Sequence, residues 1–453
     1  MRRKSVIAAI ILCVFASVST VHALPRKITI LHINDTHGHL DPFVYNGTNI
    51  GGAARIATLV KAIRASNDAP VLFFHTGDTL SRGDAMTVVS GGAANLAVLD
   101  ALGCDAYIPG NGDFYGGADD LLRFSRLAKT PFLGANITFI SNGARLFPPY
   151  IITNIGGIRT ALLGLCFIRL ENPGSKGLAM QNAVDCAQTL CPELAANDLI
   201  VALTHIGFDE DRRLASNAAI NVIIGGHSHT VISPAYTMSG IPASSNTVLI
   251  AQAGEHYAYL GRVDIVVDTA GNASVPPKVT ATGTLIPVDE HIPEDPATLE
   301  LLLTYRTMST ETLATAVKAF PHNPKGESPA GVLAASAIMS EMKADAAIID
   351  RGSITGGLAP GPVTFTGIVR MHPWRSGVIV LSLSGKQLRA AASRGDMFAS
   401  IPQSIDDAVL YTVTMTEFAF SRIKDIQRVP YRTEARRMET LIADHVRRVK
   451  TLE

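Results

Sequence analysis

The chain has 453 residues, more than a single hydrophobic core usually supports and enough for two domains. Lysine plus arginine and aspartate plus glutamate both number 39, so the charge gives no broad positive field of the kind that nucleic acid or an anionic membrane surface attracts. These features exclude nucleic acid as an expected partner and favour a small molecule.

The first 23 residues have the pattern of a secretory signal peptide. A basic start is followed by an apolar run of roughly 15 residues and by the small-residue exit Val21-His22-Ala23. The run is shorter than the ~20 residues that a membrane span needs, so a membrane anchor is the weaker alternative. We expect cleavage after Ala23, a periplasmic or secreted mature protein, and no membrane attachment afterwards.

Four cysteines remain after the expected cleavage: Cys104, Cys166, Cys186 and Cys191. An even number in an exported chain is compatible with disulfides. Cys186 and Cys191 are close enough in sequence to close a small loop, and they are the pair that we expect first. Four buried free thiols are the alternative that the sequence leaves open.

From residue 27 to about residue 267, short apolar runs alternate with helix-like stretches, which predicts an α/β layered domain. The predicted strands are rich in β-branched or large apolar residues, and they are Ile28–Ile33, Val71–Phe74, Ala106–Ile108, Thr160–Cys166, Leu199–Leu203 and Val222–Ile224. A polar or glycine-rich cluster follows each strand at once. Such clusters are expected at strand ends.

Five of these strand ends carry residues of the kind that bind metals: Asp35, His37, Asp78, Asn111, His205, His227 and His229. Functional groups of open α/β sheets gather beyond the carboxyl ends of the strands, so we expect the seven residues to meet in one site. Hydrolytic sites with two metals need such ligands from several segments and one carboxylate shared between the ions. Helix caps and turns would explain the aspartates and the asparagine, but not the three histidines at two of these ends.

A proline-rich and charged stretch between Pro287 and Pro296 marks a boundary near residue 290. An amphipathic run from Ala297 to about Leu313 predicts a linking helix. We expect a signal peptide over 1–23, a first domain over 24–290, a linker over 291–312 and a smaller domain over 313–453. The last should contain a helix at Val332–Met342 and strands at Ala346–Ile349 and Val378–Ser382.

The motifs resemble those of the calcineurin-like metallophosphoesterases. The run Ile30-Leu31-His32-Ile33-Asn34-Asp35-Thr36-His37-Gly38 is followed by Gly77-Asp78, Gly110-Asn111, Thr204-His205 and Gly226-His227-Ser228-His229. Their order and spacing are similar to the branch that contains 5′-nucleotidases, UDP-sugar hydrolases and 2′,3′-cyclic phosphodiesterases. Gly51-Gly52-Ala53-Ala54-Arg55, Gly254 and Leu260-Gly261 extend the resemblance.

The resemblance implies a four-layer α/β/β/α sandwich, followed by a smaller α/β domain that resembles the C-terminal domain of 5′-nucleotidases. It also implies two divalent metal ions: Asp35, His37 and His229 on one, Asn111, His205 and His227 on the other, and Asp78 between them. Mixed nitrogen and oxygen ligation does not discriminate among zinc, manganese, iron and cobalt.

The third motif departs from the family, which has Gly-Asn-His-Glu-Phe-Asp where this chain has Gly110-Asn111-Gly112-Asp113-Phe114-Tyr115. The family histidine that contacts the phosphoryl group is therefore replaced by Gly112, and its supporting aspartate by Tyr115. Positioned acid–base assistance is worth about 10² to 10⁴ in rate. Asp113 and His39 are weak candidates for that role, and the catalytic group is otherwise unknown.

The second domain departs from the family as well. The family motif Asn-Gly-Gly-Gly-Ile-Arg corresponds to Asp350-Arg351-Gly352-Ser353-Ile354-Thr355, so that Thr355 stands where the family has an arginine. Arg351 could supply the missing charge or could be a solvated surface residue. The stretch from Leu383 to Tyr411 is short and omits the segment that carries an aromatic residue for base stacking in the family.

The sequence therefore predicts a metal-dependent hydrolase of phosphate esters, with a nucleotide or related metabolite as the expected substrate. A dimanganese thiosulfohydrolase of sulfur oxidation is one alternative within the same family. A binding protein that keeps its metals but has lost turnover is another, and Gly112 is the feature that favours it. The sequence gives no expectation for the oligomeric state.

Overall fold

A computed structural model describes residues 25–241, 247–269 and 277–453. The expected signal peptide lies outside the described residues. Within them, no helix combines the length and the apolar character needed to cross a membrane.

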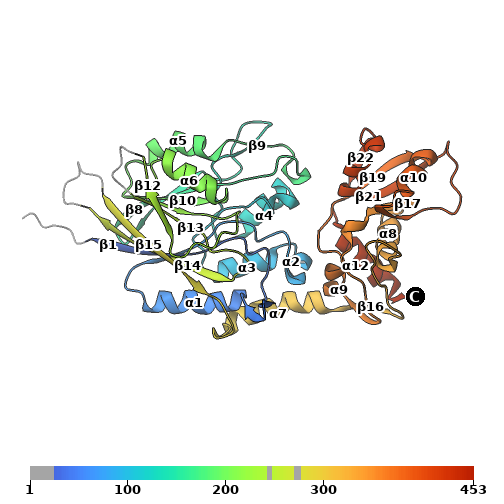
Figure 1. The fold of residues 1–453 in the computed structure, drawn as a ribbon, viewed down its shortest axis with the longest axis horizontal. Coiled ribbons are helices and arrows are strands. Elements are labelled where there is room, and N and C mark those ends of the chain that lie inside the picture. The colour runs from blue at the N-terminus through green and yellow to red at the C-terminus, as the bar shows by residue number, and fades with distance from the viewer. Residues whose placement is uncertain (1–24, 242–246, 270–276) are drawn as a thin grey trace, which may run out of the picture.

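Two mixed sheets form the centre of the first half of the chain (Figure 1). The first sheet has the order β15-β14-β1-β4-β5, with bounds Lys278–Pro287, Tyr259–Asp268, Arg26–Ile33, Val71–His75 and Ala106–Tyr107. The second has the order β12-β13-β11-β10-β8-β7, with bounds Tyr236–Ser239, Thr247–Ala251, Val222–Ile224, Leu199–Thr204, Ile158–Leu165 and Tyr150–Ile155. In each sheet the central strands run parallel, so their carboxyl ends share one edge.

Strand β10 shows why the two sheets stack and why helices cover the second sheet. Successive side chains of a strand point to opposite faces. Val201 and Leu203 join the core that the two sheets share, whereas Ile200 and Ala202 join the core beneath α5 (Ala183–Leu194) and α6 (Phe208–Asn217). The strand is apolar on both faces because both faces are buried.

Helices α1 (Ala53–Ser66) and α3 (Ala93–Ala101) cover the opposite side of the first sheet, so the four-layer α/β/β/α sandwich that the sequence predicts is confirmed (Figure 1). The remaining elements of this half are α2, α4, β2, β3, β6 and β9, at Ala85–Val89, Ala118–Leu127, Phe43–Tyr45, Thr48–Ile50, Ile137–Phe139 and Leu178–Met180.

Helix α7 (Pro296–Thr310) joins the two halves of the chain. Its start is built locally: the Asp295 side chain accepts a hydrogen bond from the Thr298 N–H, and Pro296 occupies the first turn, where its missing N–H costs nothing. The helix contacts α1, α2 and α3 on one side and α9 (Phe365–Met371) on the other. It is therefore packed against both halves.

The second half is a smaller α/β unit with two sheets (Figure 1). One has the order β18-β16-β23, at Gly361–Thr364, Thr312–Ala316 and Thr451–Leu452, and the other β20-β17-β21-β19-β22, at Met397–Ser400, Ala346–Asp350, Leu410–Thr416, Val378–Ser384 and Tyr431–Thr433. The helices besides α9 are α8, α10, α11 and α12, at Pro329–Met342, Gly385–Ala392, Glu417–Arg422 and Met438–Val449.

The expected pair Cys186–Cys191 is wrong, because both cysteines are free thiols in the structure. Both lie in α5, five residues apart, and neighbours at that spacing on a helix point in different directions and have Cα atoms too far apart for a disulfide. Cys104 and Cys166 are buried free thiols as well. The alternative of four buried thiols is confirmed.

Candidate metal centre

All seven residues that the sequence singles out lie in loops at the carboxyl ends of parallel strands. Asp35 and His37 follow β1, and Asp78 follows β4. The remaining positions follow β5, β10 and β11, and they are Asn111, His205, His227 and His229. The edge at which both sheets present these ends is therefore the place where the candidate ligands meet.

Asp35, His37 and His229 form the first group of close ligand atoms. His37 Nε2 lies 3.1 Å from His229 Nε2, and Asp35 Oδ1 lies 3.3 Å from His229 Nε2. His229 Nδ1 is 2.7 Å from a carboxylate oxygen of Glu255, so we place its proton there. The Nε2 atom then faces Asp35 with a free lone pair, which is the state in which an imidazole binds a metal.

Asp35, Asp78 and His205 form the second group. His205 Nε2 lies 3.6 Å from Asp78 Oδ1 and 3.9 Å from Asp35 Oδ1. The other oxygen of Asp78 lies 3.9 Å from His37 Nδ1. The two oxygens of Asp78 therefore approach different histidines, and Asp35 is the carboxylate that belongs to both groups.

Asn111 and His227 lie beside the second group. The His227 ring packs edge-on against the His205 ring with the centroids 5.2 Å apart, and its backbone N–H donates to Asp35 Oδ2 at 2.8 Å. Asn111 is 7 % exposed, and its Oδ1 atom has no hydrogen-bond partner. Ligand-atom distances thus group five of the seven predicted residues, His227 packs on one of them, and the backbone on both sides of Asn111 lies against Asp78.

Three buried atoms of this cluster lack any hydrogen-bond partner: Asp35 Oδ1, Asn111 Oδ1 and His205 Nε2. Buried polar atoms are nearly always paired, and an orphaned atom indicates a missing partner such as an ion. All three are acceptors that suit a divalent cation. The donor set of carboxylate, amide and imidazole therefore fits metal ions, and it suits zinc, manganese, iron or cobalt.

The backbone of the cluster is strained in a consistent way. Five of the seven residues have positive φ, a conformation that non-glycine residues rarely adopt, and they are Asp35, His37, Asp78, His227 and His229, with φ of 48°, 47°, 59°, 78° and 54°. Strain of this kind concentrates at functional sites, where the surrounding structure enforces it. These loops are shaped to aim side chains at one point.

Hydrogen bonds outside the seven residues set the orientation of two histidines. His205 Nδ1 donates to the Thr76 carbonyl at 2.7 Å, which leaves Nε2 as the lone-pair nitrogen. Glu255 does the same for His229. Such partners fix the tautomer of a ligating histidine and raise its basicity. Sequence reasoning missed Thr76 and Glu255, because neither carries a motif of its own.

The electrostatics favour the metal-binding protonation states of Asp35 and His227, whereas burial raises the pKa of Asp78 to about 6 and the pKa values of His205 and His229 are also raised. Burial raises the pKa of Asp35, but the neighbouring His205 and His229 and a hydrogen bond from Asn34 outweigh it and hold this pKa below its usual range. Burial lowers the pKa of His227 to about 4. An ionised carboxylate and a neutral imidazole are the forms that bind metals.

Asp113 is not a free acid–base group. Its two oxygens accept hydrogen bonds from the backbone N–H groups of Asp78, Thr79, Leu80 and Gly110 at 2.7 to 3.0 Å, and from the Tyr107 hydroxyl. The carboxylate therefore ties the loop after β4 to the loop after β5. Its role is to hold the two loops that carry Asp78 and Asn111.

His39 lies at the edge of the cluster. Its ring centroid is 4.0 Å from that of His256, which in turn is 5.6 Å from that of His37. Burial lowers the pKa of His39, and the charge of Arg82 lowers it further. His39 is thus near the candidate ligands, separated from His37 by the His256 ring.

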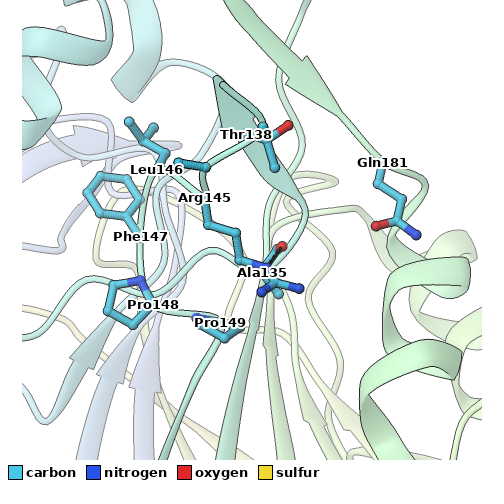
Figure 2. A pocket seen from close by; sticks show the side chains of 10 residues that line it. Ala135, Thr138, Arg145, Leu146, Phe147, Pro148, Pro149 and Gln181 are labelled. Atoms are coloured by element: carbon cyan, nitrogen blue, oxygen red, sulfur yellow. Dashed lines mark hydrogen bonds between the residues drawn. The ribbon is translucent and has the colours of Figure 1, made fainter. Parts of the chain in front are cut away.

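A hollow in the first half of the chain lies elsewhere (Figure 2). It has a volume of about 630 Å³ and is lined by Ala135, Thr138, Gly143, Ala144, Arg145, Leu146, Phe147, Pro148, Pro149 and Gln181. Arg145 donates to the Ala135 carbonyl across it at 3.0 Å (Figure 2). Its lining contains no histidine or carboxylate, so it offers none of the candidate metal ligands.

The fold and the cluster define an α/β protein with a candidate metal centre at the carboxyl edge of its two sheets, and comparison with known proteins places it more closely. Residues 28–231 match the family described as calcineurin-like phosphoesterase, and residues 307–431 match the family described as 5′-nucleotidase, C-terminal domain. The chain belongs to the calcineurin-like phosphoesterases of the 5′-nucleotidase branch, as the sequence motifs predict.

Relatives share this organisation over much of the chain. It is 27 % identical to the 5′-nucleotidase of Vibrio cholerae over 85 % of this chain and 79 % of that protein. It is 26 % identical to the trifunctional nucleotide phosphoesterase protein YfkN of Bacillus subtilis over 81 % of this chain, but it spans only 27 % of YfkN. The solved structure of the 5′-nucleotidase precursor of Thermus thermophilus is 24 % identical in sequence. The alignment covers 94 % of this chain and 97 % of that chain with a TM-score of 0.62, which shows a shared fold.

Proposed function

We propose that this protein hydrolyses phosphate esters with two divalent metal ions and that its substrates are nucleotides or related metabolites. The observation that carries the proposal is the set of three orphaned acceptors, on Asp35, Asn111 and His205, at the edge of the sheets where the candidate ligands gather. The relatives named as 5′-nucleotidases support the choice of a phosphate ester. They do not favour the thiosulfohydrolase or the inert binding protein.

The chain's own residues have separable roles in this proposal. When bound, two divalent cations neutralise the phosphoryl group and activate water for in-line attack, so no nucleophilic side chain is needed. Asp78 would hold the two ions together, and the Gly112 N–H donates to Asp78 Oδ1 at 2.6 Å, which fixes the bridge. Position 112 offers no side chain to protonate the leaving group, so departure depends on the leaving group itself.

The second half of the chain gives weaker support for a nucleoside-binding role. Thr355, which replaces the family arginine, is exposed and donates to the Arg370 carbonyl at 3.1 Å. Arg351 is not a solvated surface residue: it donates to the Gly326 carbonyl at 2.8 Å and lies 4.3 Å over the Phe398 ring. We therefore propose that metabolites with good leaving groups are hydrolysed faster than nucleoside monophosphates.

We also propose that the protein acts in the periplasm or outside the cell after removal of residues 1–23. The basic and apolar pattern of this segment supports export. Cell fractionation with N-terminal sequencing of the mature protein tests this directly. An N-terminus at residue 24 in the exported fraction is the expected result, and retention of the full chain in the cytoplasm would contradict it.

An assay with several metals tests the catalytic proposal. Nucleotides, sugar nucleotides, cyclic nucleotides and an activated aryl phosphate are offered to protein loaded with zinc, manganese, iron or cobalt. Hydrolysis should stop after chelation and should be lost in Asp78→Ala, because removal of the bridge leaves both ions underligated. Asp209→Ala removes a carboxylate that is 91 % exposed and serves as the control. Full activity after confirmed metal removal would defeat the two-metal mechanism.

A further inference from the structure

We propose that Arg82 is an anion-binding residue of the metal centre and contacts the phosphoryl oxygens of the substrate and of the phosphate product. The inference rests on the proposed function and adds a residue for which no motif accounts. Arg82 lies in the loop between β4 and α2, four residues after Asp78. Its Nη2 atom is 3.4 Å from Nδ1 of the candidate ligand His37.

The backbone of Arg82 is held directly against the loop that carries His37. Gly38 and Gly83 both have positive φ, and a Cβ at Gly38 would overlap the Arg82 carbonyl, while a Cβ at Gly83 would overlap the His37 carbonyl. The Asp84 N–H donates to the Gly38 carbonyl at 3.0 Å. Only glycine permits so close an approach of the two loops. The position of Arg82 beside the cluster is therefore built into the fold.

Arg82 has no carboxylate partner within 4 Å among the residues that the structure describes. Arginines this close to other positive charges are normally paired, because an unpaired cation beside a cation site is repelled. Two divalent ions would bring four positive charges, whereas the ligand carboxylates of Asp35 and Asp78 carry only two negative charges. The filled site thus has an excess of positive charge that Arg82 increases, and an anion bound between them would relieve it.

Metal binding also frees the guanidinium for such an anion. If His37 binds a cation through Nε2, which faces Asp35 and His229, its Nδ1 atom must carry the proton. A protonated Nδ1 cannot accept the hydrogen bond from Arg82. The N–H groups of Arg82 are then available, and a planar guanidinium fork matches two oxygens of a phosphoryl group.

The positions at which the family motifs place groups for the phosphoryl oxygens do not supply them here. Gly112 has no side chain, and Thr355 carries no charge. Arg351 is committed to the Gly326 carbonyl and the Phe398 ring. Arg82 supplies a positive charge in direct contact with a candidate ligand. Positions 112, 351 and 355 do not provide such a charge.

The test measures binding of orthophosphate to the full chain loaded with Mn²⁺, by titration calorimetry, in wild type, Arg82→Gln and Arg82→Lys. Mn²⁺ affinity is measured separately without phosphate. Arg213→Gln is the matched control, because Arg213 is 72 % exposed and pairs only with Glu210 among the described contacts. We expect Arg82→Gln to weaken orthophosphate binding about 10- to 100-fold, with an intermediate loss in Arg82→Lys and none in Arg213→Gln. Mn²⁺ affinity should be unchanged throughout.

Two outcomes overturn the inference. One is unchanged orthophosphate affinity in Arg82→Gln. The other is a loss that follows a loss of Mn²⁺, because Arg82 would then act only through His37. If Arg82→Gln does not fold, the orthophosphate affinity of Arg82→Lys decides the question. An affinity equal to that of the wild type in Arg82→Lys would exclude a contact through the guanidinium fork. Failure of the proposed function looks different: the Mn²⁺-loaded wild type would hydrolyse no phosphate ester, while the comparison of orthophosphate affinities would still be readable.

Discussion

Gly112 shows how one residue can change the chemistry of a metal centre without changing its shape. Its φ of −69° is one that any residue adopts, so the backbone does not require glycine here. A Cβ at this position would lie 3.1 to 3.2 Å from the Asp78 carboxylate, close enough to require a shift of a few tenths of an ångström. A side chain is therefore tolerable at position 112, and its absence is a chemical difference.

Restoring the family pair with Gly112→His and Tyr115→Asp should speed hydrolysis of poor leaving groups more than that of good ones. Only poor leaving groups need a proton donor, and such a donor is worth about 10² to 10⁴ in rate. The rate should be measured for a series of phosphate esters whose leaving groups differ in pKa. The dependence of the rate on that pKa should be less steep in the double variant, and the metal content should be unchanged. Single-turnover kinetics must first show that chemistry limits the parent rate. Efficient hydrolysis of nucleoside monophosphates by the parent, unimproved in the variant, would mean that another residue does this work.

The seven candidate ligands were predictable from sequence because each follows a strand whose apolar pattern is plain, and parallel strands place their ends at one edge. Arg82, Thr76 and Glu255 were not, because their roles arise from contacts between loops that are far apart in the sequence. Glu255 reaches His229 from a separate loop, 26 residues further along the chain. Only the folded arrangement shows such partners.

At the scale of elements, the site depends on loops that are tied to one another. Asp113 links the loops after β4 and β5 through four backbone N–H groups. Asp113 lies within the third motif, and its place there made it a candidate for acid–base catalysis. The structure instead gives it the role of a backbone anchor, because a buried carboxylate satisfied by so many donors has no acceptor capacity left for a substrate.

Replacing this anchor should loosen the metal site without touching a ligand. In Asp113→Asn one carboxylate oxygen becomes an NH₂ group that faces backbone donors, so we expect unfolding to become easier by about 1 to 3 kcal/mol. Metal affinity should fall as well, because Asp78 and Asn111 lose their relative placement. Urea unfolding and metal titration measure the two effects, and Asp119→Asn on the surface of α4 is the control. Wild-type metal affinity in Asp113→Asn would show that the two loops hold their shape independently.

Secondary structure was predictable where the apolar pattern was long. Strands β1, β4, β8, β10 and β11 were each expected within about two residues of their observed bounds, and so were β17 and β19, whereas helix α8 begins three residues before its expected start. The cysteine pair failed for a structural reason: residues 183–194 form a helix, and a helix separates positions that a loop would bring together. Short strands such as β2 and β9 carry too few residues to show a period.

At the scale of the whole molecule, the second half of the chain contacts the metal-site loops. Arg375 donates to the Ser81 carbonyl at 2.7 Å, and Arg437 donates to the Tyr115 carbonyl at 2.6 Å. Ser81 lies in the loop of Asp78, and Tyr115 lies in the loop of Asn111. Arg375 is itself held by the buried Glu439, 3.4 Å from its Nε atom. The second half is thus a support for both loops.

Arg437→Ala should therefore act at a distance, on the loop of Asn111. Loss of a charge-assisted hydrogen bond to the Tyr115 carbonyl should raise the population of the open loop about 10- to 100-fold, so amide hydrogen exchange over residues 110–116 should accelerate by that factor. Metal affinity should fall in the same direction, because Asn111 is a candidate ligand. Arg436→Ala is a close control: the neighbouring arginine pairs with Glu434 and Asp444 of its own half, so its loss should leave exchange over 110–116 unchanged. Equal exchange in both variants, measured on the metal-free protein by mass spectrometry, would show that the Arg437 contact does not order the loop.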